Sequence, residues 1–172
     1  MNKSILIIGL LTISFNSMAD WSGPFKGNNF VQTFPAGHEA DGKPLYIAQC
    51  AKNYATDNVA WNIGKAGVHL HNGMAYSWVG KEYDSSNCRN QEYYVYIADS
   101  NATYKWIVSN EKNTPKNAVK NNNTTSSEQF ICRASFNGGQ HPGKIFKNST
   151  RCFIAFGGKE YGMDSYEILI KE

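Results

Sequence analysis

The sequence repeats itself, and this repetition constrains the fold more than any other feature. The segments "IGKAGVHLHNGMAYSWVGKEY" (63–83) and "HPGKIFKNSTRCFIAFGGKEY" (141–161) each carry a Gly-Lys pair and, further on, a Gly-Lys-Glu triplet. Self-similarity at a fixed period is typical of chains built from repeated supersecondary units. We therefore predict a tandem duplication, with a first repeat over residues 20–100 and a second over residues 101–172.

Short runs of aromatic and β-branched residues, bounded by clusters of Gly, Asn, Pro and Ser, predict strands rather than helices. The clearest runs are 44–50, 93–97, 129–134 and 166–170. No stretch after residue 19 sustains the i, i+3, i+4, i+7 apolar pattern of an amphipathic helix. The expected fold is all-β, with two tandem β-rich repeats of about 75 residues related by a pseudo-twofold axis.

The first nineteen residues have the layout of a secretory signal peptide. Lys3 precedes an apolar run from Ile5 to Ile13, and small residues including Ala19 follow. The run is shorter than the roughly 20 residues that span a bilayer. We expect cleavage after Ala19, a secreted or periplasmic protein, and no membrane span in the mature chain.

The four cysteines of the chain agree with export. An even number of cysteines in an exported chain predicts two disulfides, and Cys50, Cys88, Cys132 and Cys152 could pair in three ways. We favour Cys50–Cys88 with Cys132–Cys152, because this pairing would staple each half separately. A zinc site is the competing interpretation, but the sequence has no Cys-x-x-Cys spacing.

The net charge of +3 comes from basic residues scattered along the chain. Nucleic-acid-binding proteins usually concentrate Lys and Arg on one face, so we expect no nucleic-acid partner. The segment "GGQHPGKI" (138–145) is close to a phosphate-binding loop, but Ile145 stands where a Ser or Thr must hold magnesium. We expect no cofactor and no metal.

Several motifs in fixed order resemble the DM-nine repeat family. The segments "HPGKIF", "CFIAFGGKEY" and "SYEIL" in the second half are close to its pattern, and the first half carries looser versions such as "NIGKAG" and "SWVGKEY". The resemblance covers essentially the whole chain after residue 19, as two consecutive repeats. It implies a compact β protein that binds mannose-type glycans as a lectin, with the possibility of a homodimer.

The resemblance also implies the site residues. In that family the sugar is held by an acidic hairpin residue, the lysine of a Pro-Gly-Lys motif and the glutamate of Gly-Lys-Glu. The corresponding residues here are Glu39, Lys65 and Glu82 in the first repeat and Asn123, Lys144 and Glu160 in the second. Because Asn cannot supply a carboxylate, we expect the first site to bind mannose more tightly than the second.

The chemistry of these residues suits a pyranose. A carboxylate accepts hydrogen bonds from two neighbouring hydroxyls, and an ammonium donates to the remaining lone pairs. Trp61, four residues before Lys65 in a loop-like context, is the candidate for stacking on a sugar face. The simpler interpretation is that the Gly-Lys pairs are turns, in which glycine supplies a positive φ and the charged residues face solvent.

Two other functions stay open. Paired carboxylates such as Glu39 and Glu82 could serve a glycan-processing enzyme, although nothing indicates the unequal environments that an acid and a nucleophile need. DM-nine repeats also occur fused to pore-forming modules, so the chain could be a non-catalytic targeting or partner subunit of a secreted toxin. Our prediction is a lectin without enzymatic activity.

Overall fold

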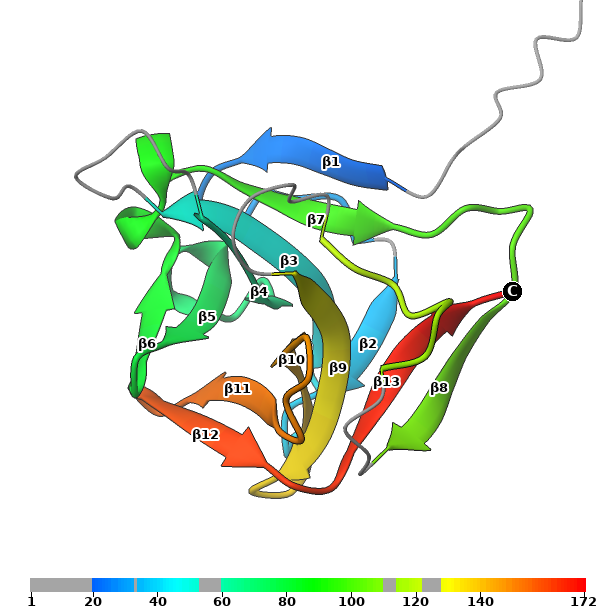
Figure 1. The fold of residues 1–172 in the computed structure, drawn as a ribbon. Coiled ribbons are helices and arrows are strands. Elements are labelled where there is room, and N and C mark those ends of the chain that lie inside the picture. Colours follow the sequence, from blue (N-terminus) through cyan, green and yellow to red (C-terminus); the bar gives the residue numbers. More distant parts are fainter. Residues whose placement is uncertain (1–19, 33, 53–59, 110–113, 122–127) are drawn as a thin grey trace, which may run out of the picture.

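A computed structural model describes residues 20–32, 34–52, 60–109, 114–121 and 128–172. The predicted signal peptide and Asn123 lie outside these ranges. The described residues form β-strands and single-turn 3-10 helices, which confirms the all-β prediction (Figure 1). No helix in the described ranges is long and apolar enough to cross a membrane.

The strands are β1 (Asp20–Phe25), β2 (Pro35–His38), β3 (Pro44–Lys52), β4 (Ala60–Ala66), β5 (Met74–Trp78), β6 (Lys81–Asp84), β7 (Tyr93–Ile97), β8 (Tyr104–Ser109), β9 (Gln129–Phe136), β10 (Gly139–Phe146), β11 (Cys152–Phe156), β12 (Lys159–Met163) and β13 (Tyr166–Lys171). The 3-10 helices are η1 (His71–Gly73), η2 (Ser85–Asn87) and η3 (Arg89–Gln91). The four strand segments predicted from the sequence fall in β3, β7, β9 and β13.

The strands are ordered symmetrically about one junction, where β6 meets β12 (Figure 1). The hydrogen-bonded order is β1-β7-β3-β4-β5-β6-β12-β11-β10-β9-β13-β8. The strands on either side of the junction are here called the first arm (β6-β5-β4-β3-β7-β1) and the second arm (β12-β11-β10-β9-β13-β8). Both arms follow the same order, so β4 corresponds to β10 and β5 to β11. This arrangement is the one that a duplicated unit would produce, while the repeat boundary at residues 100 and 101 stays a prediction.

Strand β2 lies off this path and connects the two arms. It pairs with β3 of the first arm and, through His38 and Gln140, with β10 of the second. The hydrogen-bonded strands therefore form a closed circuit that runs from β3 through the junction to β10 and back through β2. As a result β10 lies beside β4, and Glu39, the residue that follows β2, lies beside both.

The glycines of the two Gly-Lys pairs lie within strands and not in turns, so the turn interpretation is wrong for them. A Cβ at Gly64 would lie 2.2 Å from the carbonyl oxygen of Ala75, and one at Gly143 would lie 2.2 Å from that of Phe153. Only glycine allows the neighbouring strand to approach so closely. In the Gly-Lys-Glu triplets, by contrast, glycine does occupy a turn with positive φ.

Each arm has its own apolar core, and a third cluster packs between the arms. The first core gathers around Tyr76 and Val95, and the second around Ile145 and Ile168. The third cluster combines Ile47, Ile63 and Tyr96 of the first arm with residues of the second. Burial of apolar surface on both faces of the sheet thus stabilises the arms and holds them together.

The disulfides join Cys50 to Cys88 and Cys132 to Cys152, which confirms the predicted pairing. They are not equivalent in the two arms. Gly64 pairs with Ala48, whereas the equivalent Gly143 pairs with Cys132, so Ala48 is the counterpart of Cys132. Cys50 lies two residues further along β3. The first disulfide ties the segment of η2 and η3 to β3.

Candidate functional site

Lys65 lies inside the molecule. Its side chain on β4 is 2% exposed, and its Nζ donates to Glu39 Oε1 at 3.3 Å and to His141 Nδ1 at 3.2 Å. Glu39 follows β2 and His141 lies on β10, so three segments converge on one ammonium. Burial in the interior is tolerated because the charge is paired with a carboxylate and hydrogen bonded.

His141 is a neutral acceptor in this arrangement. A lysine ammonium can only donate, so the His141 Nδ1 that faces it carries no proton. The proton then resides on Nε2, which donates to the carbonyl oxygen of Phe136 at 3.1 Å. Burial, followed by the nearby charge of Lys65, lowers the pKa of His141 below its usual value. The imidazole is therefore uncharged at pH 7.

Lys65 and Glu39 line a pocket of about 400 Å³ whose wall also includes Glu82, so the three residues predicted for the first repeat share one cavity. Glu82 Oε2 accepts a hydrogen bond from the backbone N–H of Gly158 at 2.6 Å. In the described part of the chain, Glu82 Oε1 has no hydrogen-bond partner. The Phe156 ring forms another part of the wall, with its centroid 5.5 Å from Lys65 Nζ.

Two histidines and an aspartate complete the polar wall of this pocket. His69 Nε2 lies 3.6 Å from Glu39 Oε1, beyond hydrogen-bond range, and neither nitrogen of this ring is hydrogen bonded within the described ranges. His71 Nδ1 lies 2.7 Å from Asp84 Oδ2. Burial alone would raise the pKa of Asp84, but hydrogen bonds from Ser86 and His71 outweigh it and lower that pKa.

These additional residues are only weakly indicated by the sequence. His69 and His71 stand out as the pair in "HLH". His141 opens the motif "HPGKIF" without being singled out as a site residue, and Asp84 lies in no motif. Across the described ranges, no three His, Cys, Asp or Glu side chains are arranged as a metal site.

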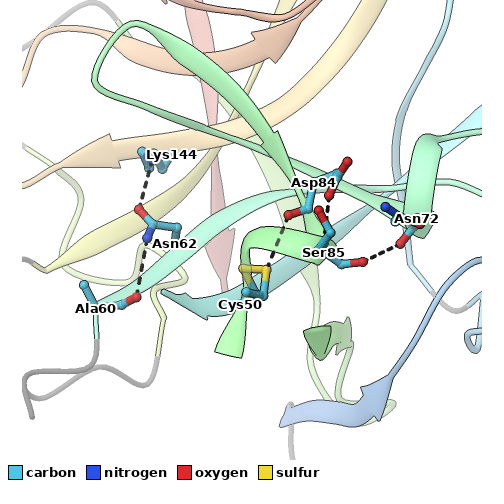
Figure 2. Close-up of a disulfide and its surroundings, with 9 residues drawn as sticks. Cys50, Ala60, Asn62, Asn72, Asp84, Ser85 and Lys144 are labelled. Atoms are coloured by element: carbon cyan, nitrogen blue, oxygen red, sulfur yellow. Dashed lines mark hydrogen bonds between the residues drawn. A yellow bond between two sulfur atoms is a disulfide. The ribbon is translucent and has the colours of Figure 1, made fainter. Parts of the chain in front are cut away.

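Lys144, the counterpart of Lys65, is fully buried and contacts neutral oxygens. Its Nζ donates to Asn62 Oδ1 at 3.2 Å, as Figure 2 shows, and to the carbonyl oxygen of Ser77. Asn62 and His141 correspond, because each lies three residues before the lysine of its own strand. Burial lowers the pKa of Lys144 to about 7, and the charge of Glu160 only partly opposes this.

The described members of the second predicted set, Lys144 and Glu160, differ from the first set in what surrounds the lysine. Asn123 lies outside the described residues. Glu160 Oε2 accepts from the backbone N–H of Gly80 at 2.7 Å, which mirrors the bond of Glu82 to Gly158. The arms therefore share the position of the glutamate and the lysine, and differ in the surroundings of the lysine.

Trp61 does not line the pocket of Lys65, and its loop-like context is wrong, since it lies on β4. Strand β4 pairs with both β3 and β5, and this pairing overrides the weak strand propensity of its Asn and Gly. Four residues of strand separate Trp61 from Lys65 by roughly 13 Å. Ile63, buried between them, belongs to the core between the arms.

The fold and the pocket define a class of protein: a small, disulfide-bonded, all-β domain of two similar arms with a lysine buried against a carboxylate. The DM9 repeat family model matches residues 60–163, more than half of the chain. The chain belongs to this family, which confirms the resemblance seen in the sequence.

Among solved structures, the nematode sperm cell motility protein MFP2B is similar, with a TM-score of 0.58 and 15% sequence identity. The match covers 100% of this chain and 49% of that chain, so this chain spans about half the length of MFP2B. At this identity the likeness shows the fold alone. No curated protein sequence matches the chain.

Proposed function

We propose that this protein is a lectin that binds mannose-type glycans in the pocket of Lys65. The observation that carries the proposal is a buried ammonium, held between Glu39 and a neutral His141, at the wall of a cavity that also contains the Glu82 carboxylate. The pocket volume of about 400 Å³ lies in the range of about 300–1,000 Å³ that small-ligand sites occupy.

The unsatisfied groups of the pocket match the hydroxyls of a sugar. Glu82 Oε1 can accept from a hydroxyl of the sugar. Neighbouring hydroxyls of a pyranose can donate to a carboxylate while their lone pairs accept from an ammonium. Charge-assisted bonds of this kind are stronger than neutral ones.

The site is proposed to bind and not to catalyse. Glu39 already accepts from Lys65, and Glu82 accepts from a backbone amide, so both carboxylates serve as fixed acceptors. A glycosidase needs one of the two as a proton donor. The two disulfides suit an oxidising compartment, in keeping with a secreted or periplasmic protein.

A single polar site of this size should bind a monosaccharide weakly, at about −4 kcal/mol or a Kd near 1 mM. A homodimer would present two such pockets to a glycan surface, and simultaneous engagement would raise the avidity by orders of magnitude.

The first prediction compares the two buried lysines by calorimetric titration with methyl α-mannoside. Lys65→Met removes the Lys65 ammonium from the pocket wall and should lower the affinity roughly ten- to a hundredfold, as expected for the loss of a charged hydrogen bond. Lys144→Met is the matched control, since Lys144 does not line this pocket, and it should bind nearly as the unaltered protein does. Circular dichroism checks the fold of both. Unchanged binding by a folded Lys65→Met protein would contradict the proposed site.

A further inference from the structure

Two further hollows lie on the first arm, away from the pocket of Lys65. One, of about 320 Å³, is lined by Trp21, Gln49, Trp61 and Tyr94. The other, of about 350 Å³, is lined by Ala51, Trp61, Arg89, Asn90, Glu92 and Tyr94. Both are lined by Trp61 and Tyr94, so the two hollows adjoin, and together they are here called the aromatic groove. The rings of Trp61 and Tyr94 contact nearly at right angles, with centroids 5.3 Å apart.

The aromatic groove contains a buried polar atom that has no partner. Gln49 is 4% exposed, and its Oε1 makes no hydrogen bond to any residue in the described ranges. Buried polar groups are almost always hydrogen bonded, and an unpaired one costs about 1–3 kcal/mol. Gln49 Oε1 is closed to solvent in this structure, so a ligand donor can satisfy it when the amide turns toward the groove.

At the equivalent place of the second arm, polar side chains of the protein hydrogen bond to one another. Gln49 pairs with Tyr94 in the first arm, and Arg133 pairs with Glu167 in the second. Gln49 therefore corresponds to Arg133, and Tyr94 to Glu167. Arg133 Nε donates to Glu167 Oε2 at 2.7 Å, and Gln140 Nε2, at the position of Trp61, donates to the same oxygen at 2.8 Å.

This internal network is also stacked on an indole ring. The Arg133 guanidinium lies 4.2 Å from the centroid of the Trp106 ring. Trp106 pairs with a residue of β13, and Trp21 pairs with the equivalent residue of β7, so the two tryptophans correspond. The second arm therefore closes this place with a planar polar group over a tryptophan. The first arm has rings and an unpaired amide there instead.

We propose that the aromatic groove binds linked pyranose units of a glycan, independently of the pocket of Lys65. A pyranose with equatorial hydroxyls has apolar C–H faces that stack on an indole, while its rim hydroxyls can donate to Gln49 Oε1 once that amide turns toward the groove. The adjoining hollow offers Arg89, Asn90 and Glu92 as donors and acceptors for the next unit. This inference goes beyond the proposed function, because it assigns a second site with different chemistry.

A cation is the competing occupant, since the second arm holds its own guanidinium over Trp106. In the adjoining hollow the charge of Glu92 is offset by that of Arg89 and by that of Lys26, whose Nζ lies 3.5 Å from Glu92 Oε1. The neutral amide of Gln49 is a weaker partner for a cation than the carboxylate of Glu167. A neutral polyhydroxyl ligand therefore fits the groove better.

The test uses cellotriose, three β-linked glucose units with equatorial hydroxyls, followed by calorimetry and by tryptophan fluorescence of the full mature chain. Trp61→Ala should weaken cellotriose binding by about tenfold or more. Gln49→Met should also weaken it, yet should not lower stability, because a near-isosteric apolar side chain replaces an unpaired buried acceptor. Lys65→Met, which disables the other site, and Gln140→Ala, at the place equivalent to Trp61, should bind within about twofold of the unaltered protein.

Each alternative result would overturn the proposal. The proposal fails if the unaltered protein does not bind cellotriose. It also fails if Trp61→Ala and Gln49→Met both still bind cellotriose, or if Lys65→Met no longer binds it. Binding of N-acetyl-arginine methylamide in place of cellotriose would assign the groove to a cation. Because mannoside binding and cellotriose binding are measured on the same variants, the aromatic groove and the Lys65 pocket can fail separately.

Discussion

At the scale of single residues, the clearest strain lies in the turn between β5 and β6. Val79 has φ 47°, and its side chain is 75% exposed. A β-branched residue in the left-handed region is unfavourable, because its Cβ crowds the backbone. The corresponding turn of the second arm has Gly157 at this position, with φ 57°. At the same position of the turn, the first arm thus has a residue that is strained by this conformation, Val79, and the second arm has one that adopts it freely, Gly157.

Val79→Gly should therefore stabilise the protein. The left-handed conformation costs roughly 1–2 kcal/mol for a side-chain-bearing residue, and the greater freedom of glycine in the unfolded chain returns about 0.4–1 kcal/mol of this. The expected net gain is up to about 1 kcal/mol in urea unfolding with the disulfides intact. The reciprocal change, Gly157→Val, meets open space and should destabilise by a similar amount through strain alone. A loss of stability in Val79→Gly would show that the Val79 side chain makes a favourable contact.

At the scale of elements, β4 and β10 show what could and could not be predicted from the sequence. β7 was predicted at its observed bounds because "YYVYI" is a continuous run of strand-favouring residues. β4 was not, since Trp61 preceded an Asn and a Gly that suggested a loop. Lys65 was found through the repeated phrase, whereas its contact with His141 depends on β2 bridging the arms. Such long-range pairing leaves no local pattern.

The buried amine of β10 makes stability depend on pH. The pKa of Lys144 is about 7 in the folded protein, below the 10.5 of an unperturbed lysine, so the unfolded chain binds more protons between these values. Stability should then rise with pH across this window, by up to about 1.4 kcal/mol per pH unit, and should be lowest below pH 7. Urea unfolding between pH 7 and 9.5 measures this slope.

Lys144→Met should flatten that slope, because it removes the group that titrates. Lys159→Met, which changes an exposed lysine on β12, is the control and should keep the slope of the unaltered protein. The upper limit of pH 9.5 avoids the tyrosines, since burial raises the pKa of Tyr93 to about 12 while an unfolded tyrosine titrates near 10. Equal slopes in all three proteins would contradict the assignment to Lys144.

At the scale of the whole molecule, the arms are joined by a symmetric exchange of hydrogen bonds at the junction of β6 and β12. The backbone N–H groups of Glu82 and Glu160 donate to the carbonyls of Gly158 and Gly80 at 3.2 Å. Their carboxylates accept from the backbone N–H groups of the same two glycines. The glutamate of each Gly-Lys-Glu triplet thus stabilises the contact between arms, a role that the sequence did not indicate.

This symmetry separates the structural role of these glutamates from the role in binding. Glu82→Gln and Glu160→Gln each remove one charged acceptor from a backbone amide. Both should lower stability by about 1 kcal/mol, less than the usual 1.5–3 kcal/mol for a charged hydrogen bond because these bonds are exposed to solvent.

Only Glu82 lines the pocket of Lys65, so only Glu82→Gln should also weaken binding of methyl α-mannoside. The expected loss is roughly ten- to a hundredfold, from the replacement of a charged acceptor by a neutral one. Urea unfolding and calorimetric titration of both variants give the two quantities side by side. If the variants lost affinity equally, the loss would reflect the junction, and Glu82 would have no contact with the sugar. If only stability changed, and in both alike, the glutamates would serve the junction alone.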